Sequence, residues 1–361
     1  MKKTLVLTHE YYPFKGGVAR YVYNLFKDYN KDDYLVLTDH KEVKSHDNII
    51  NTRLRWPLVK PSWGLSILKL KKIIKENSIE QIFTPNILPL GSVAYFLKIP
   101  YIISLHGLDI NLALKNKPEL TKKILHNAKH IIVNSQSTAL SLKGLDLDEK
   151  KISLIYPSVD LVDKYDTRVL EAFRKKLDIK DGEKILLTVG RLVKRKGHDL
   201  VIDAISQLKD EYNIKYFIVG SGPEKDNIKK LIKEKNLNKK VFLFENIKDQ
   251  EKIYFYKMSD VFVMPHRSEE GDIEGLGIVY LEAANMHIPI ICGARGGVTE
   301  IFSPDDVLMV ENADVRQLNR HLRYLLKNKK EADKLSDRAY QIIQNFNNVS
   351  RKSDILKQIL Q

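Results

Sequence analysis

Short apolar runs rich in β-branched residues alternate with longer amphipathic stretches along most of the chain. The apolar runs are typical of buried strands, and the amphipathic stretches are typical of helices. The runs begin at residues 4, 34, 80, 100, 130 and 151 in the first half and at residues 184, 215, 241, 260, 289 and 306 in the second. Strands that alternate with helices in this way form parallel sheets covered on both faces. The pattern therefore predicts an α/β protein.

The alternation lapses in a polar segment, residues 157–183, and then restarts. We therefore predict two doubly wound, Rossmann-like domains that face each other across a cleft. The first spans residues 1–165 and the second residues 166–347, and a C-terminal helix, residues 348–361, completes the first domain. Ligands of open α/β sheets bind at the carboxyl ends of the strands, so we expect the site in the loops that follow strands.

The composition narrows the class of protein. The chain has 361 residues, of which 43% are hydrophobic and 29% charged, as in a globular protein rather than a disordered one. The single cysteine, Cys292, excludes an internal disulfide and suits a reducing cytoplasm. No secretory signal is visible, and Lys98 and Pro100 interrupt the longest apolar region, so we expect no membrane span.

The formal net charge of +14 favours an anionic partner, and the charge is unevenly distributed. Residues 53–75 contain seven basic residues, two tryptophans and no acid, with Trp63, Ile67, Leu70 and Ile74 at helical spacing. One interpretation is a stripe that faces the core, opposite a solvated lysine face. The other is a basic amphipathic segment that rests on an anionic membrane. Nucleic acid is disfavoured, because no known nucleic-acid-binding signature is present.

Two loops after strands contain glycines beside a predicted helix. Gly16 and Gly17 precede a helix that starts near residue 18, where free N–H groups and the helix dipole favour an anion. The alternative is a flexible turn.

In the second half, Gly190 follows a strand directly, and Arg191 and Lys196 lie in the loop. A forked guanidinium and a point charge together match a diphosphate, whereas a solvated basic loop is the alternative. The spacing of this loop does not fit a P-loop, and the stretch GSGPEKD, residues 220–226, does not fit GxGxxG.

The sequence EGLGIVYLEAA, residues 274–284, holds two carboxylates around an apolar run that opens with two glycines. It follows a predicted strand and a polar loop, so Gly275 and Gly277 mark the turn into a helix. We expect the amides of Leu276, Gly277, Ile278 and Val279 to hold a phosphate there. Glu274 and Glu282 are separated by about 12 Å of helix and would each bind the hydroxyls of a sugar. A capping Glu and a surface Glu are the alternative, but they leave Glu282 unexplained within an apolar run.

These motifs together resemble the retaining GT-B glycosyltransferases of family four, which include bacterial mannosyl- and glucosyltransferases. The matching pieces are PFKGGVARYVYNL, SLHGLD, VGRLVKRKG, VGSGP and EGLGIVYLEA, in the family's order over nearly the whole chain. The segment GDIEGLGIVYLEA is similar to that of mannosyltransferases that extend phosphatidylinositol mannosides from GDP-mannose.

The resemblance implies roles for individual residues. Glu274 would contact the donor hexose and Glu282 the nucleotide ribose, while Arg191 and Lys196 would neutralise the diphosphate. Gly17 would let the first loop approach that diphosphate.

Four residues of the first half are further candidates. His106 would contact the sugar through its side chain or backbone, although a lone histidine is more often structural. Asp109 would bind donor or acceptor, or cap a helix. His9 and Glu10 are candidates for the acceptor side.

The sequence thus predicts a retaining, metal-independent hexosyltransferase that needs no cofactor besides its GDP- or UDP-linked donor. The acceptor would be a lipid-linked or cell-surface glycan, as in lipopolysaccharide or capsule biosynthesis. We expect the protein in the cytoplasm, peripheral at the inner face of the membrane through residues 53–75. A sugar-nucleotide epimerase of the same architecture and a membrane-bound, non-catalytic sugar-nucleotide binder remain alternatives.

Overall fold

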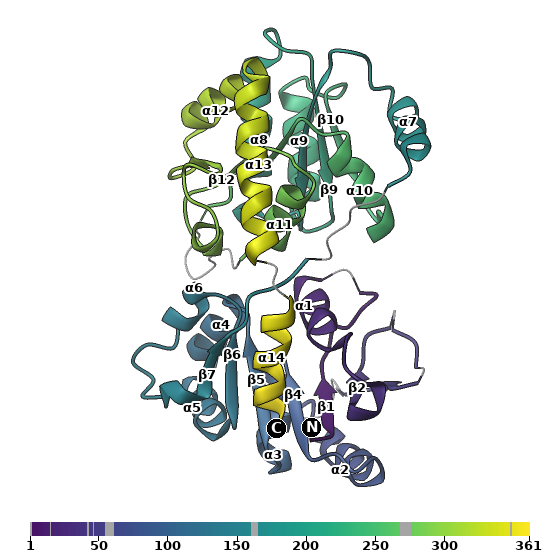
Figure 1. Ribbon diagram of the computed structural model, residues 1–361, viewed down its shortest axis with the longest axis vertical. Coiled ribbons are helices and arrows are strands. Elements are labelled where there is room, and N and C mark those ends of the chain that lie inside the picture. Colours follow the sequence, from purple (N-terminus) through teal and green to yellow (C-terminus); the bar gives the residue numbers. More distant parts are fainter. Residues whose placement is uncertain are drawn as a thin grey trace. The chain divides into compact units, whose positions relative to one another are not determined.

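The computed structural model describes residues 2–14, 16–41, 43–45, 47–54, 61–159, 165–267, 276–346 and 349–361. The chain divides into two compact units (Figure 1). Unit 1 comprises residues 1–158 and 348–361, and unit 2 comprises residues 159–347. Residues 160–164 lie outside the described part, and the predicted boundary at 165/166 stays a prediction.

Unit 1 is built on a parallel sheet of seven strands in the order β3-β2-β1-β4-β5-β6-β7. The strands are β1 (Thr4–Leu7), β2 (Tyr34–Thr38), β3 (Ile49–Asn51), β4 (Gln81–Thr84), β5 (Tyr101–Leu105), β6 (His130–Val133) and β7 (Ile152–Leu154). Every residue of β1, β2, β4 and β5 is buried, because helices cover both faces of the sheet. The strand order reverses between β1 and β4, which is where ligands of such sheets bind.

The helices of unit 1 bury apolar stripes against this sheet. They are α1 (Gly17–Phe26), α2 (Ser66–Glu76), α3 (Ser92–Leu97), α4 (Leu108–Asn116), α5 (Pro118–Asn127), α6 (Gln136–Leu140) and the C-terminal α14 (Val349–Leu360). Leu356 and Leu360 of α14 are fully buried in one core cluster with residues of α1 and β1. The side chain of Gln81 also donates to the carbonyl of Leu360, at 2.8 Å. The C-terminal helix is therefore an integral part of unit 1.

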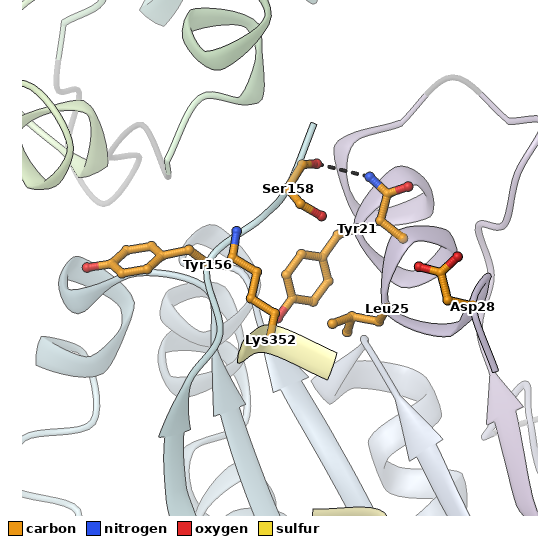
Figure 2. A pocket seen from close by; sticks show the side chains of 7 residues that line it. Tyr21, Leu25, Asp28, Tyr156, Ser158 and Lys352 are labelled. Atoms are coloured by element: carbon orange, nitrogen blue, oxygen red, sulfur yellow. Dashed lines mark hydrogen bonds between the residues drawn. The ribbon is translucent and has the colours of Figure 1, made fainter. Parts of the chain in front are cut away.

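The segment that leaves β7 is fixed to unit 1 by side chains from two helices (Figure 2). Tyr21 of α1 donates to the carbonyl of Ile155 at 2.9 Å, and Asn24 donates to that of Ser158 at 3.0 Å. Lys352 of α14 donates to the carbonyl of Pro157 at 2.9 Å. A cavity of about 20 Å³ remains among them, which is room for about one water molecule. The segment thus stays attached to unit 1 as far as Ser158.

Unit 2 repeats this architecture with a parallel sheet of six strands in the order β10-β9-β8-β11-β12-β13. The strands are β8 (Lys184–Val189), β9 (Ile214–Val219), β10 (Val241–Phe244), β11 (Val261–Met264), β12 (Ile290–Gly293) and β13 (Leu308–Val310). The helices are α7 (Thr167–Lys176), α8 (His198–Leu208), α9 (Lys225–Glu234), α10 (Asp249–Lys257), α11 (Ile278–Asn285), α12 (Val315–Lys327) and α13 (Lys329–Phe346). The strand order reverses between β8 and β11.

The prediction of two doubly wound α/β domains is confirmed, and every apolar run that predicted a strand forms one. The strand β3 was not predicted. It is only three residues long and follows a polar stretch, so its sequence carries no run long enough to be distinguished.

Candidate active site

His9 lies just beyond the carboxyl end of β1 and is held by an aspartate that follows the neighbouring strand. Its Nδ1 is 2.8 Å from Oδ1 of Asp39, and both side chains are mostly buried. The two strands are paired, so Thr8 and Asp39 emerge at the same edge of the sheet. Asp39 fixes the orientation of the His9 ring, and sequence reasoning missed it because the two residues are distant in the chain.

Gly16 is the N-cap residue of α1, and Gly17 is the first residue of that helix. A Cβ atom on Gly16 would lie 2.8 Å from Oε2 of Glu10 and equally close to the ring of Phe14. Close packing inside the loop therefore requires glycine at this position. It also brings the Glu10 carboxylate near the N-terminus of α1, where the helix dipole favours negative charge. The phosphate contact of Gly16 and Gly17 stays a prediction.

His106 follows β5 and has protein partners at both ring nitrogens. Its Nε2 is 2.9 Å from the Ser104 hydroxyl, and its Nδ1 is 3.4 Å from the Asn134 amide. The ring also packs edge-on against Tyr21, with centroids 4.9 Å apart. This enclosure lowers the pKa of His106 to about 4, so the ring is neutral at physiological pH.

Asp109 lies in the first turn of α4, where its Oδ1 accepts the backbone N–H of His106 at 2.9 Å. Burial raises the pKa of Asp109 to about 6, although hydrogen bonds from backbone N–H groups oppose that rise. These contacts show Asp109 holding the turn between β5 and α4. A role in acceptor binding stays a prediction.

The loop after β8 brings a cation against a glycine. Lys196 is only 9% exposed, and a Cβ atom on Gly190 would lie 3.9 Å from its Nζ. Arg191 is exposed, and within the described part of the chain no hydrogen bond or ion pair involves its guanidinium. Its backbone carbonyl instead accepts from Nε2 of His198 at 3.3 Å. The two predicted diphosphate ligands thus lie in one loop, one packed inward and one open to solvent.

Further glycines let the loops of unit 2 pack backbone against backbone. A Cβ atom on Gly220 would lie 1.9 Å from the carbonyl oxygen of Gly190, and one on Gly293 would lie 1.9 Å from that of His266. A Cβ atom on Gly197, whose φ is +76°, would lie 2.5 Å from the carbonyl oxygen of Pro265. These contacts draw together the loops after β8, β9, β11 and β12. Gly220, the first glycine of VGSGP, is therefore explained by its close approach to the backbone of Gly190.

Arg267, which follows β11, joins its loop to the loop that carries Lys196. Its Nη2 forms an ion pair with Asp199, at 2.8 and 3.0 Å from the two carboxylate oxygens, and donates to the carbonyl of Lys194 at 2.9 Å. Its own backbone N–H donates to the carbonyl of Arg195 at 2.8 Å. Sequence reasoning missed this pair, since the partners come from different βα units.

Gly277 has a φ of +70° and is the N-cap residue of α11. Leu276 before it is buried, and Ile278 and Val279 form the first turn of the helix. The first N–H groups of a helix lack a partner inside it, so an anion at this end would meet them. Glu274 and Gly275 lie outside the described residues, and their predicted contacts stay predictions.

The N-terminal end of α11 is fixed to the loop after β11 by two buried side chains. The Tyr280 hydroxyl lies 2.6 Å from Nδ1 of His266 and 2.8 Å from the carbonyl of Met264. Burial, helped by the positive charges of Lys196 and Arg195, lowers the pKa of His266 to about 4, although a hydrogen bond to the carbonyl of Arg295 opposes that shift. Those charges act on His266 because the cationic loop after β8 is close to it, and His266 in turn contacts Tyr280 of α11.

Glu282 lies within α11 and is partly exposed. Its Oε2 accepts a hydrogen bond of 2.7 Å from the hydroxyl of Tyr256, which is on α10. This partner is a tyrosine that no sequence motif indicated, and the predicted contact of Glu282 with a sugar stays a prediction.

The basic segment has two distinct faces where the structure describes it. Residues 55–60 lie outside the described part. On α2, Leu70 is buried and Ile67 and Ile74 pack against the core, as does Trp63 just before the helix, so the interpretation as a core-facing stripe is confirmed. The opposite face carries Leu68, which is 73% exposed, and four exposed lysines, Lys69, Lys71, Lys72 and Lys75. Among the described helices, none has the length and apolar character of a membrane span.

Two family models match the chain, one in each half. The model described as Glycosyltransferase Family 4 matches residues 15–163, and the model described as Glycosyl transferases group 1 matches residues 170–342. Two Rossmann-like units with these signatures define a glycosyltransferase of the GT-B class. The chain belongs to glycosyltransferase family four.

Curated relatives match along most of their length. One, from Corynebacterium glutamicum, is a GDP-mannose-dependent monoacylated alpha-(1-6)-phosphatidylinositol monomannoside mannosyltransferase. It is 29% identical over 344 residues, which are 90% of this chain and 89% of the relative. Another, from Campylobacter jejuni, is an N-acetylgalactosamine-N,N'-diacetylbacillosaminyl-diphospho-undecaprenol 4-alpha-N-acetylgalactosaminyltransferase. It is 28% identical over 81% of this chain and 80% of its own.

A solved structure from Anabaena, Alr3699/HepE in complex with UDP and glucose, superposes with a TM-score of 0.82. It covers 100% of this chain and 99% of its own, at 16% identity. At that level of identity the likeness shows the fold alone. The fold, the two family models and the relatives together make this chain a nucleotide-sugar-dependent glycosyltransferase.

Proposed function

We propose that the chain is a retaining hexosyltransferase that moves a mannose- or glucose-type hexose from a nucleotide diphosphate to a hydroxyl of a lipid-linked or cell-surface glycan. Donor binding is assigned to unit 2. The observation that supports it best is that Lys196, packed on Gly190, follows β8 while the N-terminal end of α11 follows β11. Both lie at the reversal point between β8 and β11.

The diphosphate gains negative charge as the glycosidic bond breaks. Lys196, Arg191 and the first amides of α11 would stabilise that charge, and such preorganised electrostatics are usually the largest contribution to catalysis. Because these cations belong to the protein, the proposal requires no metal ion. Glu274 would hold the donor hexose and Glu282 the ribose. The leaving phosphate would take the acceptor proton on the same face of the sugar, so the anomeric configuration is kept.

His106 acts in this proposal as a neutral group that contacts the donor sugar, rather than as a base. Both of its ring nitrogens are engaged by Ser104 and Asn134, and its pKa of about 4 leaves it a weak base. A role as a general base would require it to break one of these contacts. His9, oriented by Asp39, together with Glu10 and Asp109 would meet the acceptor at the edge of unit 1.

The nature of donor and acceptor is inferred from the relatives. Two mannosyltransferases with GDP-mannose in their names match about nine-tenths of the chain, which favours GDP-mannose. The Anabaena structure contains UDP, so UDP-hexoses are the second choice. Acceptors named for the relatives are phosphatidylinositol mannosides and an undecaprenol-linked glycan, and both are lipid-linked. We therefore place the protein in the cytoplasm, at the inner face of the membrane, with the exposed lysines of α2 against anionic lipid.

A donor panel tests the proposal. GDP-mannose, UDP-glucose and UDP-galactose are screened for thermal stabilisation of the protein and then for transfer to octyl glycosides, with and without EDTA. We expect one donor to raise the melting temperature, and NMR of the product to show the donor's anomeric configuration, with EDTA having no effect. Inversion of configuration would refute a retaining reaction. Isomerisation of the donor without acceptor would indicate an epimerase, and binding without turnover would indicate a non-catalytic binder.

A further inference from the structure

Tyr256 is a buried residue near the end of α10 whose hydroxyl reaches the helix of the candidate donor site. Its side chain is 2% exposed, and the hydroxyl donates to Oε2 of Glu282 at 2.7 Å. We propose that Tyr256 is a positioning residue that fixes the Glu282 carboxylate to receive the two ribose hydroxyls of the donor nucleotide. The proposal rests on the assignment of Glu282 to the ribose.

The Tyr256 hydroxyl is a permanent hydrogen-bond donor. Burial raises its pKa well above the usual value, and the adjacent Glu282 carboxylate raises it further. The phenol therefore keeps its proton throughout the physiological range. A buried hydroxyl without a partner is costly, so the Tyr256–Glu282 contact is maintained whether or not a ligand is bound.

This contact leaves Glu282 able to bind a diol. A carboxylate offers about four lone-pair positions, and the phenol takes one of them. Glu282 is partly exposed, and no partner other than Tyr256 is found for it among the described residues. A glutamate held in one rotamer loses less conformational freedom when a ligand binds than a free one does. The expected gain is in affinity for the ribose specifically.

The aromatic ring of Tyr256 is packed independently of its hydroxyl. It stacks on Phe262 of β11 with centroids 6.0 Å apart, and Phe262 packs edge-on against Tyr280 of α11 at 5.7 Å. Tyr256→Phe therefore removes one oxygen and keeps the packing. Tyr216→Phe is a matched control, because Tyr216 is equally buried in unit 2 but its hydroxyl lies 2.6 Å from that of Thr188 in the core.

The test is calorimetric titration of the wild type and both variants with GDP, UDP, their 2′-deoxy and 3′-deoxy forms, and inorganic pyrophosphate. We expect wild type to bind the ribonucleotide more tightly than its deoxy forms. Tyr256→Phe should weaken ribonucleotide binding by about tenfold and shrink the difference between ribo- and deoxynucleotide. Its binding of pyrophosphate, which has no ribose, should be unchanged. Tyr216→Phe should behave as wild type in all titrations.

The outcomes separate this inference from the function on which it rests. If wild type binds ribo- and deoxynucleotides with equal affinity, and Glu282→Gln does the same, Glu282 does not hold the ribose. The ribose assignment and the positioning role of Tyr256 then both fail. If wild type discriminates and Tyr256→Phe discriminates equally well, only the positioning role is overturned. A loss of pyrophosphate binding in Tyr256→Phe, matching the loss for nucleotides, would show that the hydroxyl supports the fold instead.

Discussion

At the carboxyl end of β8, the side chain of Lys196 lies over Gly190 and is 9% exposed. An amine in such a position interacts more strongly with a bound anion than a solvated lysine does, because water screens it less. Lys194 lies two residues earlier in the same loop but is exposed. Burial therefore distinguishes Lys196 from Lys194, although both side chains carry the same charge.

Replacement of Lys196 tests this distinction at the scale of one residue. Lys196→Met keeps the length of the side chain and removes the charge. We expect kcat/KM to fall by roughly 100- to 1000-fold, as when one electrostatic contact to a transition state is removed. Lys194→Met should stay within about twofold of wild type, because exposed charges contribute little. Comparable losses in both variants would mean that the loop acts only through its overall charge.

Single residues also show where sequence reasoning stops. The glycines, cations and carboxylates of the donor side were identifiable because each lies in a recognisable loop after a strand. Asp39, Arg267 and Tyr256 were not, since each contacts a site residue that is distant in the chain. Gly16 and Gly220 belong to motifs that were identifiable in the sequence, but both glycines are explained by packing against loops of the protein itself. Such contacts between loops can be recognised only in the folded structure.

Among the secondary-structure elements, α2 presents two different surfaces. Its inner face packs on the core through Leu70, while Leu65 and Leu68 on the outside are 49% and 73% exposed among lysines. Nearby, Trp63 stacks on the half-exposed Phe96 of α3. Exposed leucines between lysines match a helix that lies on an anionic bilayer, with the apolar side chains entering the interface.

Charge reversal on α2 tests this membrane contact. We expect Lys69→Glu, Lys71→Glu and Lys72→Glu together to weaken binding to vesicles containing phosphatidylglycerol by about a hundredfold or more, at about 1 kcal/mol for each lysine. Sedimentation with vesicles measures this. Lys229, Lys230 and Lys233 on α9 are an exposed triple for a matched control, which should bind like wild type. Binding of the α2 variant that is as tight as that of wild type, at low and at high salt alike, would refute the contact.

The elements themselves were predictable because parallel strands are buried on both faces and therefore appear as continuous apolar runs. This held for β8 and β9, and it failed for β3, which has three residues. From the sequence, a core-facing stripe and a basic segment that rests on a membrane are two alternative interpretations of α2. The structure assigns the core-facing stripe to one face and leaves the lysines on the other, so the two interpretations do not exclude each other.

For the molecule as a whole, buried histidines link folding to pH. His198 and His266 are 2% and 3% exposed, and burial lowers the pKa of each to about 4. Lys196 lies near both, and Asp199 and Glu224 also act on His198. Among the described residues, Nδ1 of His198 has no hydrogen-bond partner, so a proton there would be buried without an acceptor. The native state of unit 2 is therefore built around neutral imidazoles in its cationic loops.

The sign of the resulting pH dependence follows from these pKa values. Between about pH 6.5 and pH 4 the unfolded chain binds protons at these histidines and the native state does not. The free energy of unfolding should therefore be fully retained above pH 6.5 and should fall as the pH drops to about 4, by roughly 2–3 kcal/mol for each histidine. Urea denaturation at pH 7.5, 5.5 and 4.5 measures how the free energy of unfolding changes with pH.

His198→Gln replaces one of the buried histidines with an amide that can still donate to the carbonyl of Arg191. It should reduce the slope by one histidine's share. His287→Gln, at an exposed histidine, should not change it, and a slope that is the same in all three proteins would mean that carboxylates rather than buried imidazoles set the acid limit.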